Sequence, residues 1–155
     1  MCTLVLGIGN TLLTDEGVGV HAVRYLEDHH TDVPDTQYLD GGTLSFTLAG
    51  SIENAHNLIV IDAAQLDTNP GTVRTFVGAD MDEFLSGNTK RSVHEVGLMD
   101  LLSIARLADH LPENRALIGI QPGNIDWGEN PTAPVQAALP IACQHAVNLI
   151  NQWQS

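Results

Sequence analysis

The sequence predicts a single-domain α/β protein, a three-layer sandwich in which helices cover both faces of a twisted, mostly parallel sheet. Short apolar runs typical of buried strands alternate along the chain with segments whose apolar residues recur at helical spacing. The 155 residues contain no internal repeat, low-complexity tract or linker, so one domain is expected to span residues 1–155. Hydrophobic residues make up 43% and aromatic residues 5%, which indicates a real core built mainly from aliphatic side chains and alanine.

The first part of the chain reads as strand, helix, strand and helix. Residues 2–8 form an apolar run that ends near glycine, as a buried strand does. From Val18 to about His29, apolar residues recur at helical spacing. A short second strand is predicted over residues 36–40, after which Thr43 is placed to cap a helix over residues 44–52.

The middle of the chain holds the clearest buried strand, residues 57–61, which runs directly into Asp62. A turn signal at 69–71 precedes an alternating segment, residues 72–77, that predicts another strand. The connection between these two strands is too short for a helical crossover, so the second should pair antiparallel at an edge of the sheet. Residues 78–92 mix acids, glycine and two bases, and predict a surface loop with room for one helical turn.

The last part of the chain predicts a helix, a strand, a long loop and a final helix. Apolar residues on one helical face indicate the first of these helices: Leu98, Leu101, Leu102, Ala105 and Ala108. Residues 116–120 form a final strand, and residues 121–134 form a polar loop rich in Gly, Asn and Pro. Helical spacing then runs from Val135 to Trp153, with Pro140 inside it as a kink or the first turn of a new helix.

The charge of the chain limits its partners. The formal net charge is −13, from 19 acidic against 6 basic residues, and such a chain repels phosphate backbones and anionic lipid head groups. Nucleic acid and membrane surfaces are therefore excluded as expected partners, whereas a metal ion or a cationic peptide segment fits the charge. No signal peptide and no apolar run near the ~20 residues of a membrane helix is visible, so we expect a cytoplasmic protein.

Neither cysteine of the chain predicts chemistry. Cys2 and Cys143 have no CxxC spacing and form no disulfide framework. Cys2 lies at the start of a predicted strand and Cys143 in the last predicted helix, and both are expected to be buried spectators.

Acidic residues gather where the predicted strands end, which is where open α/β sheets bind ligands. Asp15 and Glu16 follow the first strand, Asp40 ends the second, and Asp62 ends the third. Any one of these acids alone is more simply a helix cap, and Asp40, beside two glycines, suits that structural role best. Asp62 differs, because a carboxylate at the mouth of a buried strand needs a hydrogen-bond donor or a metal.

Of the seven histidines, His94 is the candidate for chemistry, because it lies in a predicted polar loop just before a helix. Glu16, Asp62 and His94 together offer two carboxylates and one imidazole, a set that suits a divalent first-row metal such as Zn, Ni or Mn. Their spacing by itself does not show that they meet, since each would come from a separate loop.

Other chemistries find less support in the sequence. Gly7-x-Gly9 resembles the start of a dinucleotide-binding loop, but Leu12 stands at the third glycine position and Asp40 comes too late for the ribose-binding acid. The chain contains no P-loop lysine, no GxSxG elbow and no HExxH motif.

Five segments together resemble a known family, the hydrogenase maturation proteases, which are the endopeptidases of [NiFe]-hydrogenase assembly. The segments occur in the family's order and cover residues 3–122: Leu6-Gly7-Ile8-Gly9-Asn10-x-Leu12-x-x-Asp15-Glu16-Gly17-x-Gly19-Val20, Leu39-Asp40-Gly41-Gly42-Thr43, Ile59-Val60-Ile61-Asp62-Ala63, Ser92-Val93-His94-Glu95-x-Gly97 and Gly119-Ile120-Gln121-Pro122. The histidine segment and the last segment look most like members that process uptake-type hydrogenases.

The resemblance implies an activity and a set of site residues. It implies an endopeptidase, of aspartyl or metal-dependent type, that removes a C-terminal extension from a hydrogenase large-subunit precursor after nickel insertion. The family's metal-contacting positions correspond to Glu16, Asp62 and His94, and Asp40 corresponds to a supporting residue. The resemblance also implies that the divalent ion is the nickel of the substrate itself.

Two other classes of function stay open from the sequence. The same three ligands would serve a non-catalytic binder that checks the precursor for nickel, and Gly7-x-Gly9 leaves a nucleotide-binding enzyme as a weaker possibility. The sequence does not indicate which hydrogenase is the substrate, which bond is cut, or the oligomeric state.

Overall fold

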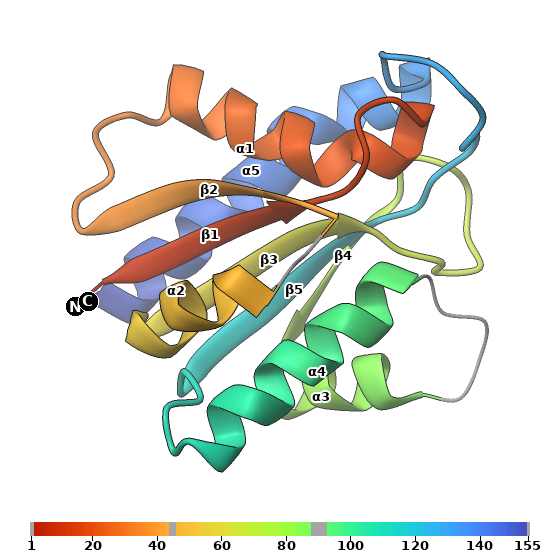
Figure 1. The fold of residues 1–155 in the computed structure, drawn as a ribbon. Helices are drawn as coiled ribbons and strands as arrows, with labels where there is room; N and C mark the ends of the chain where they lie inside the picture. The colour runs from red at the N-terminus through yellow and green to blue at the C-terminus, as the bar shows by residue number, and fades with distance from the viewer. Residues whose placement is uncertain (1, 44–45, 88–92, 155) are drawn as a thin grey trace.

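The computed structural model describes residues 2–43, 46–87 and 93–154, and for Phe46 and residues 93–96 it describes the backbone alone. Within these ranges the chain forms the predicted sandwich of one sheet between two layers of helices (Figure 1). No helix in the described part is long and apolar enough to cross a membrane.

The sheet has five strands in the order β2-β1-β3-β5-β4. Their bounds are β1 Thr3–Ile8, β2 Thr36–Gly42, β3 Asn57–Ala63, β4 Val73–Val77 and β5 Asn114–Ile120. The pairs β1–β2, β1–β3 and β3–β5 are parallel, whereas β4 pairs antiparallel with β5 at one edge, as the short connection after β3 predicted. The carboxyl ends of four strands therefore meet at one edge of the sheet.

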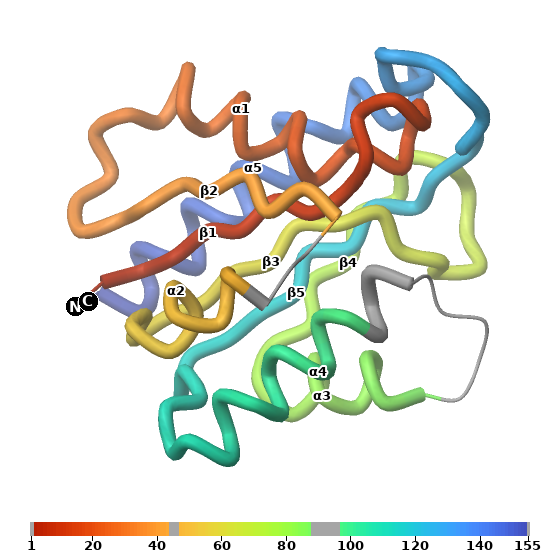
Figure 2. The backbone as a smooth tube through the Cα atoms, viewed as in Figure 1, coloured from red at the N-terminus to blue at the C-terminus, as the bar shows by residue number. Residues whose placement is uncertain are grey.

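In the described part of the chain, α1 and α5 cover one face of the sheet, and α2, α3 and α4 cover the other (Figure 2). Their bounds are α1 Val18–His29, α2 Ala49–Asn54, α3 Ala79–Ser86, α4 Val93–Leu107 and α5 Ala133–Gln154, with short 3-10 helices η1 Thr14–Gly17 and η2 Phe46–Leu48. Side chains of α1 and α5 pack with Ile59 and Ile61 of β3 in one core, and side chains of α2, α3 and α4 pack with Leu58 and Val60 in the other. The alternation of β3 between the two cores follows from the two-residue period of a strand.

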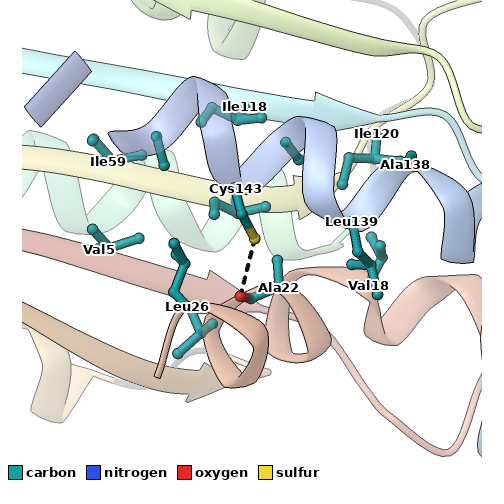
Figure 3. Close-up of a cluster of buried hydrophobic side chains, with 14 of the residues drawn as sticks. Val5, Val18, Ala22, Leu26, Ile59, Ile118, Ile120, Ala138, Leu139 and Cys143 are labelled. Atoms are coloured by element: carbon teal, nitrogen blue, oxygen red, sulfur yellow. Dashed lines mark hydrogen bonds between the residues drawn. The ribbon is translucent and has the colours of Figure 1, made fainter. Parts of the chain in front are cut away.

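The core under α1 and α5 contains Cys143, as the side-chain view shows (Figure 3). The thiol is fully buried and donates to the carbonyl oxygen of Ala22 at 3.3 Å, so the expected buried spectator is confirmed. Burial raises the pKa of the Cys143 thiol to about 12, which keeps it protonated at neutral pH. Cys2, by contrast, is exposed, because it lies before the first residue of β1; the expectation that it is buried was wrong.

The structure differs from the sequence prediction in two helical segments on the same face. Residues 79–86, expected to lie in a surface loop, form α3, because Met81 and Leu85 lie one helical turn apart and both bury in the core. The rest of that expected loop, residues 88–92, lies outside the described residues. Helix α4 begins at Val93 rather than near Leu98, since a helix packed through its later turns gains a backbone hydrogen bond for each residue added at its start.

Two other boundaries also differ. Residues 44–45, where the helix predicted over 44–52 would begin after a Thr43 cap, lie outside the described residues. The rest of that segment is the 3-10 helix η2 followed by α2, which begins at Ala49 without a side-chain cap. Helix α5 runs through Pro140 as one element. Pro140 is exposed, so its ring faces solvent on the outer side of the helix, where the loss of one backbone hydrogen bond is least costly.

Helix α1 crosses the sheet at glycine contacts that bring it unusually close to β1 and β3. A Cβ atom on Gly19 would lie 2.1 Å from the carbonyl oxygen of Ile61 and 2.3 Å from that of Ile8. A Cβ atom on Gly7 would lie 2.3 Å from the carbonyl oxygen of Gly19. These contacts are between backbones, so no side-chain movement can relieve a larger residue, and they hold the start of α1 against the strand that carries Asp62.

We expect Gly19→Ala to lower the free energy of unfolding by about 3 kcal/mol, because the added methyl group would overlap two strand backbones. Urea denaturation of the variant and the parent protein measures this difference. Gly50→Ala is the matched control: Gly50 lies in α2, and among the described residues outside its own helix backbone no atom lies within 4 Å of the added Cβ. Alanine there should raise stability by about 0.5–1 kcal/mol. Equal stability of Gly19→Ala and the parent would show that α1 can shift.

Candidate functional site

Glu16 lies in η1, just beyond the carboxyl end of β1. Gly9, with a φ of 145°, passes so close to η1 that a Cβ atom there would lie 2.1 Å from the carbonyl oxygen of Glu16. The η1 helix also contacts β3. The backbone of Glu16 is therefore seated on the turn after β1, and its half-buried side chain starts from the edge where the parallel strands end.

The neighbouring acid, Asp15, is fully buried and accepts four hydrogen bonds. One carboxylate oxygen accepts from the backbone N–H groups of Gly123 and Asn124, at 2.8 and 3.0 Å, and from the hydroxyl of Thr132 at 2.8 Å. The other oxygen accepts from the N–H of Thr132 at 2.7 Å. Burial raises the pKa of Asp15, but these hydrogen bonds together outweigh it, so the pKa lies below its usual value of 3.8 and the group is a carboxylate at neutral pH.

Further hydrogen bonds join the loop after β5 to the loop before η1. The N–H of Asp15 donates to the carbonyl oxygen of Asn124 at 3.0 Å, and the N–H of Thr14 donates to that of Gly128 at 2.8 Å. The N–H of Gly128 in turn donates to the carbonyl oxygen of Leu12 at 2.9 Å, which completes a parallel bridge. The two loops lie side by side in Figures 1 and 2, and Asp15 fixes them to each other.

Asp62 lies near the end of β3 and is 2% exposed. Because Ile61 and Ala63 face the core under α1 and α5, the strand period turns Asp62 toward the face covered by α2, α3 and α4. The chain after β3 is held by Gln121, whose Oε1 accepts from the N–H of Leu66 at 2.6 Å. A rigid strand end therefore carries this buried carboxylate.

His94 lies in the first turn of α4, not in a loop as the sequence predicted. Helix α4 leads into β5, which is parallel to β3, so α4 must run antiparallel to the strands and begin at their carboxyl edge (Figure 1). The backbone of His94 therefore starts from the edge that holds Glu16 and Asp62, on the face toward which Asp62 is turned. The side chain of His94 lies outside the described part of the structure.

Asp40 lies on β2 at a more open position. One carboxylate oxygen accepts from the N–H of Gly42 at 2.8 Å, and the other lies 4.0 Å from a guanidinium nitrogen of Arg24. Both side chains are about half exposed, so this ion pair contributes little to stability. Asp40 thus shapes the turn at the end of β2 and does not cap a helix in the described residues, and its supporting role in the site stays a prediction.

The three predicted ligands come from elements that start or end at the same edge, but their ligand geometry stays a prediction. Among the residues whose side chains are described, no three His, Cys, Asp or Glu side chains form a group that could hold a metal ion. The predicted set includes His94, whose side chain is not among them. The sequence did not predict that Asp15 holds the loop of residues 121–134. The signal in the sequence was that this long loop is polar, so that it needs hydrogen-bond partners elsewhere in the chain.

The Gly7-x-Gly9 segment does not form a phosphate-binding loop. Gly7 packs against the backbone of Gly19, and Gly9 packs against the backbone of Glu16, so neither glycine leaves space for a phosphate. An acidic side chain thus follows the loop where a dinucleotide fold would place phosphate, and its charge opposes that ligand. The nucleotide-binding alternative has no support in this geometry.

Two grooves in the described part of the chain lie away from these acids. One, of about 530 Å³, lies between α3 and α4, and another, of about 390 Å³, lies at the amino ends of β3 and β5. Neither groove is lined by Glu16 or Asp62, so neither supports a small-molecule site around these acids.

Known proteins resemble this chain along most of its length. The model of the hydrogenase maturation protease family matches residues 20–149. The hydrogenase expression/formation protein HupD of Rhizobium leguminosarum bv. viciae is 38% identical over 151 residues, which are 97% of this chain and 74% of that protein. The hydrogenase 2 maturation protease of Escherichia coli K12 is 34% identical over 98% of this chain and 92% of that protein. The structure of the hydrogenase maturating endopeptidase HybD from E. coli superposes with a TM-score of 0.88 at 31% identity, over 98% of this chain and 93% of that one.

We expect Asp15→Asn to lower the free energy of unfolding by about 3 kcal/mol at neutral pH, because an amide cannot accept all the hydrogen bonds that the buried carboxylate accepts. The pKa of Asp15 is lowered on folding, so its stabilisation is fully present above the usual value of 3.8 and is lost as the pH falls through the lower folded value. The stability difference between the parent and Asp15→Asn should therefore shrink below about pH 4. Urea denaturation from pH 7 down to about pH 3 measures it.

Asp126→Asn is the control for this prediction, because Asp126 is an exposed acid in the same loop. Its effect on stability should stay within about 0.5 kcal/mol. A difference for Asp15→Asn that does not change with pH would show that the charge of Asp15 is not what holds the two loops.

Proposed function

Because the chain belongs to the hydrogenase maturation protease family, we propose that it is the endopeptidase that removes a C-terminal extension from the nickel-loaded precursor of a [NiFe]-hydrogenase large subunit. The observation that carries this proposal is the 34% identity to the hydrogenase 2 maturation protease of E. coli, which extends over almost the whole of both chains. An uptake-type hydrogenase as the source of the precursor, and the cytoplasm as the place of reaction, are parts of the same proposal.

We further propose that Glu16, Asp62 and His94 bind the nickel that the precursor carries, with Asp40 in a supporting role. Two carboxylates and one imidazole are suitable donors for a divalent first-row metal. Three protein ligands from separate elements leave coordination positions for groups of the substrate. When bound, the ion supplies a Lewis acid beside the scissile carbonyl.

Contacts within the chain position two of the proposed ligands, Glu16 and Asp62. The hydrogen bonds to Asp15 hold the backbone of Glu16, and the end of β3 holds Asp62 in a buried position. A nickel ion bound to precursor would attract the negatively charged oxygens of both proposed carboxylate ligands. Recognition of nickel would thereby limit cleavage to precursor that has received its metal.

Cysteine chemistry does not compete with this proposal. Burial raises the pKa of Cys143 to about 12 and its thiol donates into the core, so it is neither a nucleophile nor a thiolate ligand. Cys2 lies before the amino end of β1, at the edge of the sheet opposite Glu16 and Asp62.

We expect nickel-loaded precursor to be cut and nickel-free precursor to be left intact, because the site lacks thiolates and should hold a free ion weakly. The purified protein should then contain less than one metal ion per chain. Mass spectrometry of the precursor before and after incubation measures cleavage, and metal analysis measures the ion. Efficient cleavage of nickel-free precursor by chelator-treated protein would contradict the nickel requirement, whereas tight binding without any cleavage would favour the nickel-checking binder.

We expect His94→Ala and Asp62→Ala to abolish cleavage of nickel-loaded precursor, because each variant removes a proposed ligand. His94→Ala should change the free energy of unfolding by no more than about 0.5 kcal/mol. His110→Ala is the control, because this exposed histidine lies just before β5, at the amino edge of the sheet, and should cleave at the parent rate. An unfolded His94→Ala protein would instead assign this histidine a structural role.

A further inference from the structure

Three large apolar side chains are exposed on the two loops that Asp15 joins. Leu12 is 50% exposed, Ile125 57% and Trp127 80%. We refer to Leu12, Ile125 and Trp127 as the apolar platform. Contact of these apolar side chains with water is unfavourable. Exposed apolar side chains gathered on neighbouring loops often mark a surface that a partner covers.

The platform is built on a rigid backbone. The bridge between Leu13 and Gly128 places the residues that precede them, Leu12 and Trp127, next to each other in register. The N–H of Leu12 also donates to the side chain of Asn10 at 3.0 Å, and the N–H of Asp126 donates to the side chain of Asn124 at 2.8 Å. A surface ordered in advance loses little conformational entropy when it binds.

The charge around the platform selects the partner. Residues 10–17 and 121–134 contain four acids, Asp15, Glu16, Asp126 and Glu129, and no Lys, Arg or His. Asp15 is buried and its carboxylate accepts four hydrogen bonds, so the exposed acids of this surface that a partner can reach are Asp126 and Glu129. A partner segment with basic side chains would be attracted here, whereas a second copy of this acidic chain would be repelled.

The platform also adjoins the candidate site. Glu16 follows Asp15 directly, and Asp15 carries the hydrogen bonds that hold the loop of Trp127. A peptide segment bound on the platform would therefore have Glu16 close to one of its ends. The other large apolar side chains exposed on helices, Ile104 and Leu107 of α4 and Ile141 of α5, do not lie on these two loops.

We propose that the apolar platform binds an extended segment of the substrate protein in which an apolar side chain lies next to Lys or Arg, and so positions the scissile region beside Glu16. This proposal rests on the proposed function, because it assigns part of the same substrate. Trp127 is the anchor, since tryptophan in a covered interface contributes more binding energy than most residues. Asp126 and Glu129 pair with the basic side chains.

Cleavage kinetics with nickel-loaded precursor test the anchor. Trp127→Ser should raise KM about tenfold or more and leave kcat within about twofold, because the anchor acts in binding and not in the chemical step. Leu107→Ser is the matched control and should keep the parent KM. An unchanged KM for Trp127→Ser would overturn the proposal while leaving the protease function intact.

A charge reversal tests the proposed pairing of the acids with basic side chains of the substrate. Glu129→Lys should raise KM severalfold and weaken its dependence on salt concentration, because it replaces an attraction by a repulsion. Glu113→Lys, at an exposed acid just before β5, is the control with the same change in net charge. Equal effects of the two variants would show that only the net charge matters, and would overturn the assignment of Glu129.

Fluorine NMR separates binding from cleavage. In a Trp153→Phe protein labelled with fluorotryptophan, Trp127 gives the only signal, because the chain has two tryptophans. Precursor should shift and broaden this signal as the side chain leaves water. Cleavage without any change in the signal would overturn the platform but not the protease, whereas a shift without cleavage would keep the platform and overturn the protease. A shift that appears without precursor as protein concentration rises would identify a second copy as the occupant and overturn the proposal.

Discussion

The buried carboxylate of Asp15 joins two parts of the chain that lie 108 positions apart in the sequence, from Asp15 to Gly123. Removing a charged group from water is costly, and it is tolerated here because the donors around Asp15 replace its lost hydration. The carboxylate adds to the backbone hydrogen bonds that already join the loop after β5 to the loop after β1. The hydrogen bonds of the Asp15 carboxylate thus help to assemble the edge of the sheet where ligands are expected.

Two adjacent acids have different roles because their surroundings differ. Asp15 is completely buried and its carboxylate oxygens are used by the protein, so it shapes the edge and is not available to a substrate. Glu16, the next residue, is half-buried and starts from the same short helix. The structural acid therefore orients the proposed functional one through the backbone of η1, and the same hydrogen bonds order the platform of Leu12, Ile125 and Trp127.

A second constraint places the other acid of the site. The close contact of Gly19 with the backbones of Ile8 and Ile61 holds the start of α1 against β1 and β3, while the strand period turns Asp62 to the opposite face. Glu16 thus comes from η1, directly before α1, and Asp62 comes from β3. Helix α4 begins at the same edge because it must return to the start of β5.

The sequence alone was enough to predict the fold class, the order of the strands along the chain, the antiparallel edge strand and helix α1, because burial in a strand or on one helix face leaves a local apolar pattern. It also identified the family, since the motifs around Glu16, Asp62 and His94 are local. It did not reveal helix α3, whose apolar positions are too few for a clear period, or the helical position of His94, which depends on packing further along α4. The role of Asp15 could be found only in the tertiary structure, because its partners at Gly123, Asn124 and Thr132 are backbone and hydroxyl groups distant in sequence. Such groups carry no residue pattern, and only the folded chain brings them to one carboxylate.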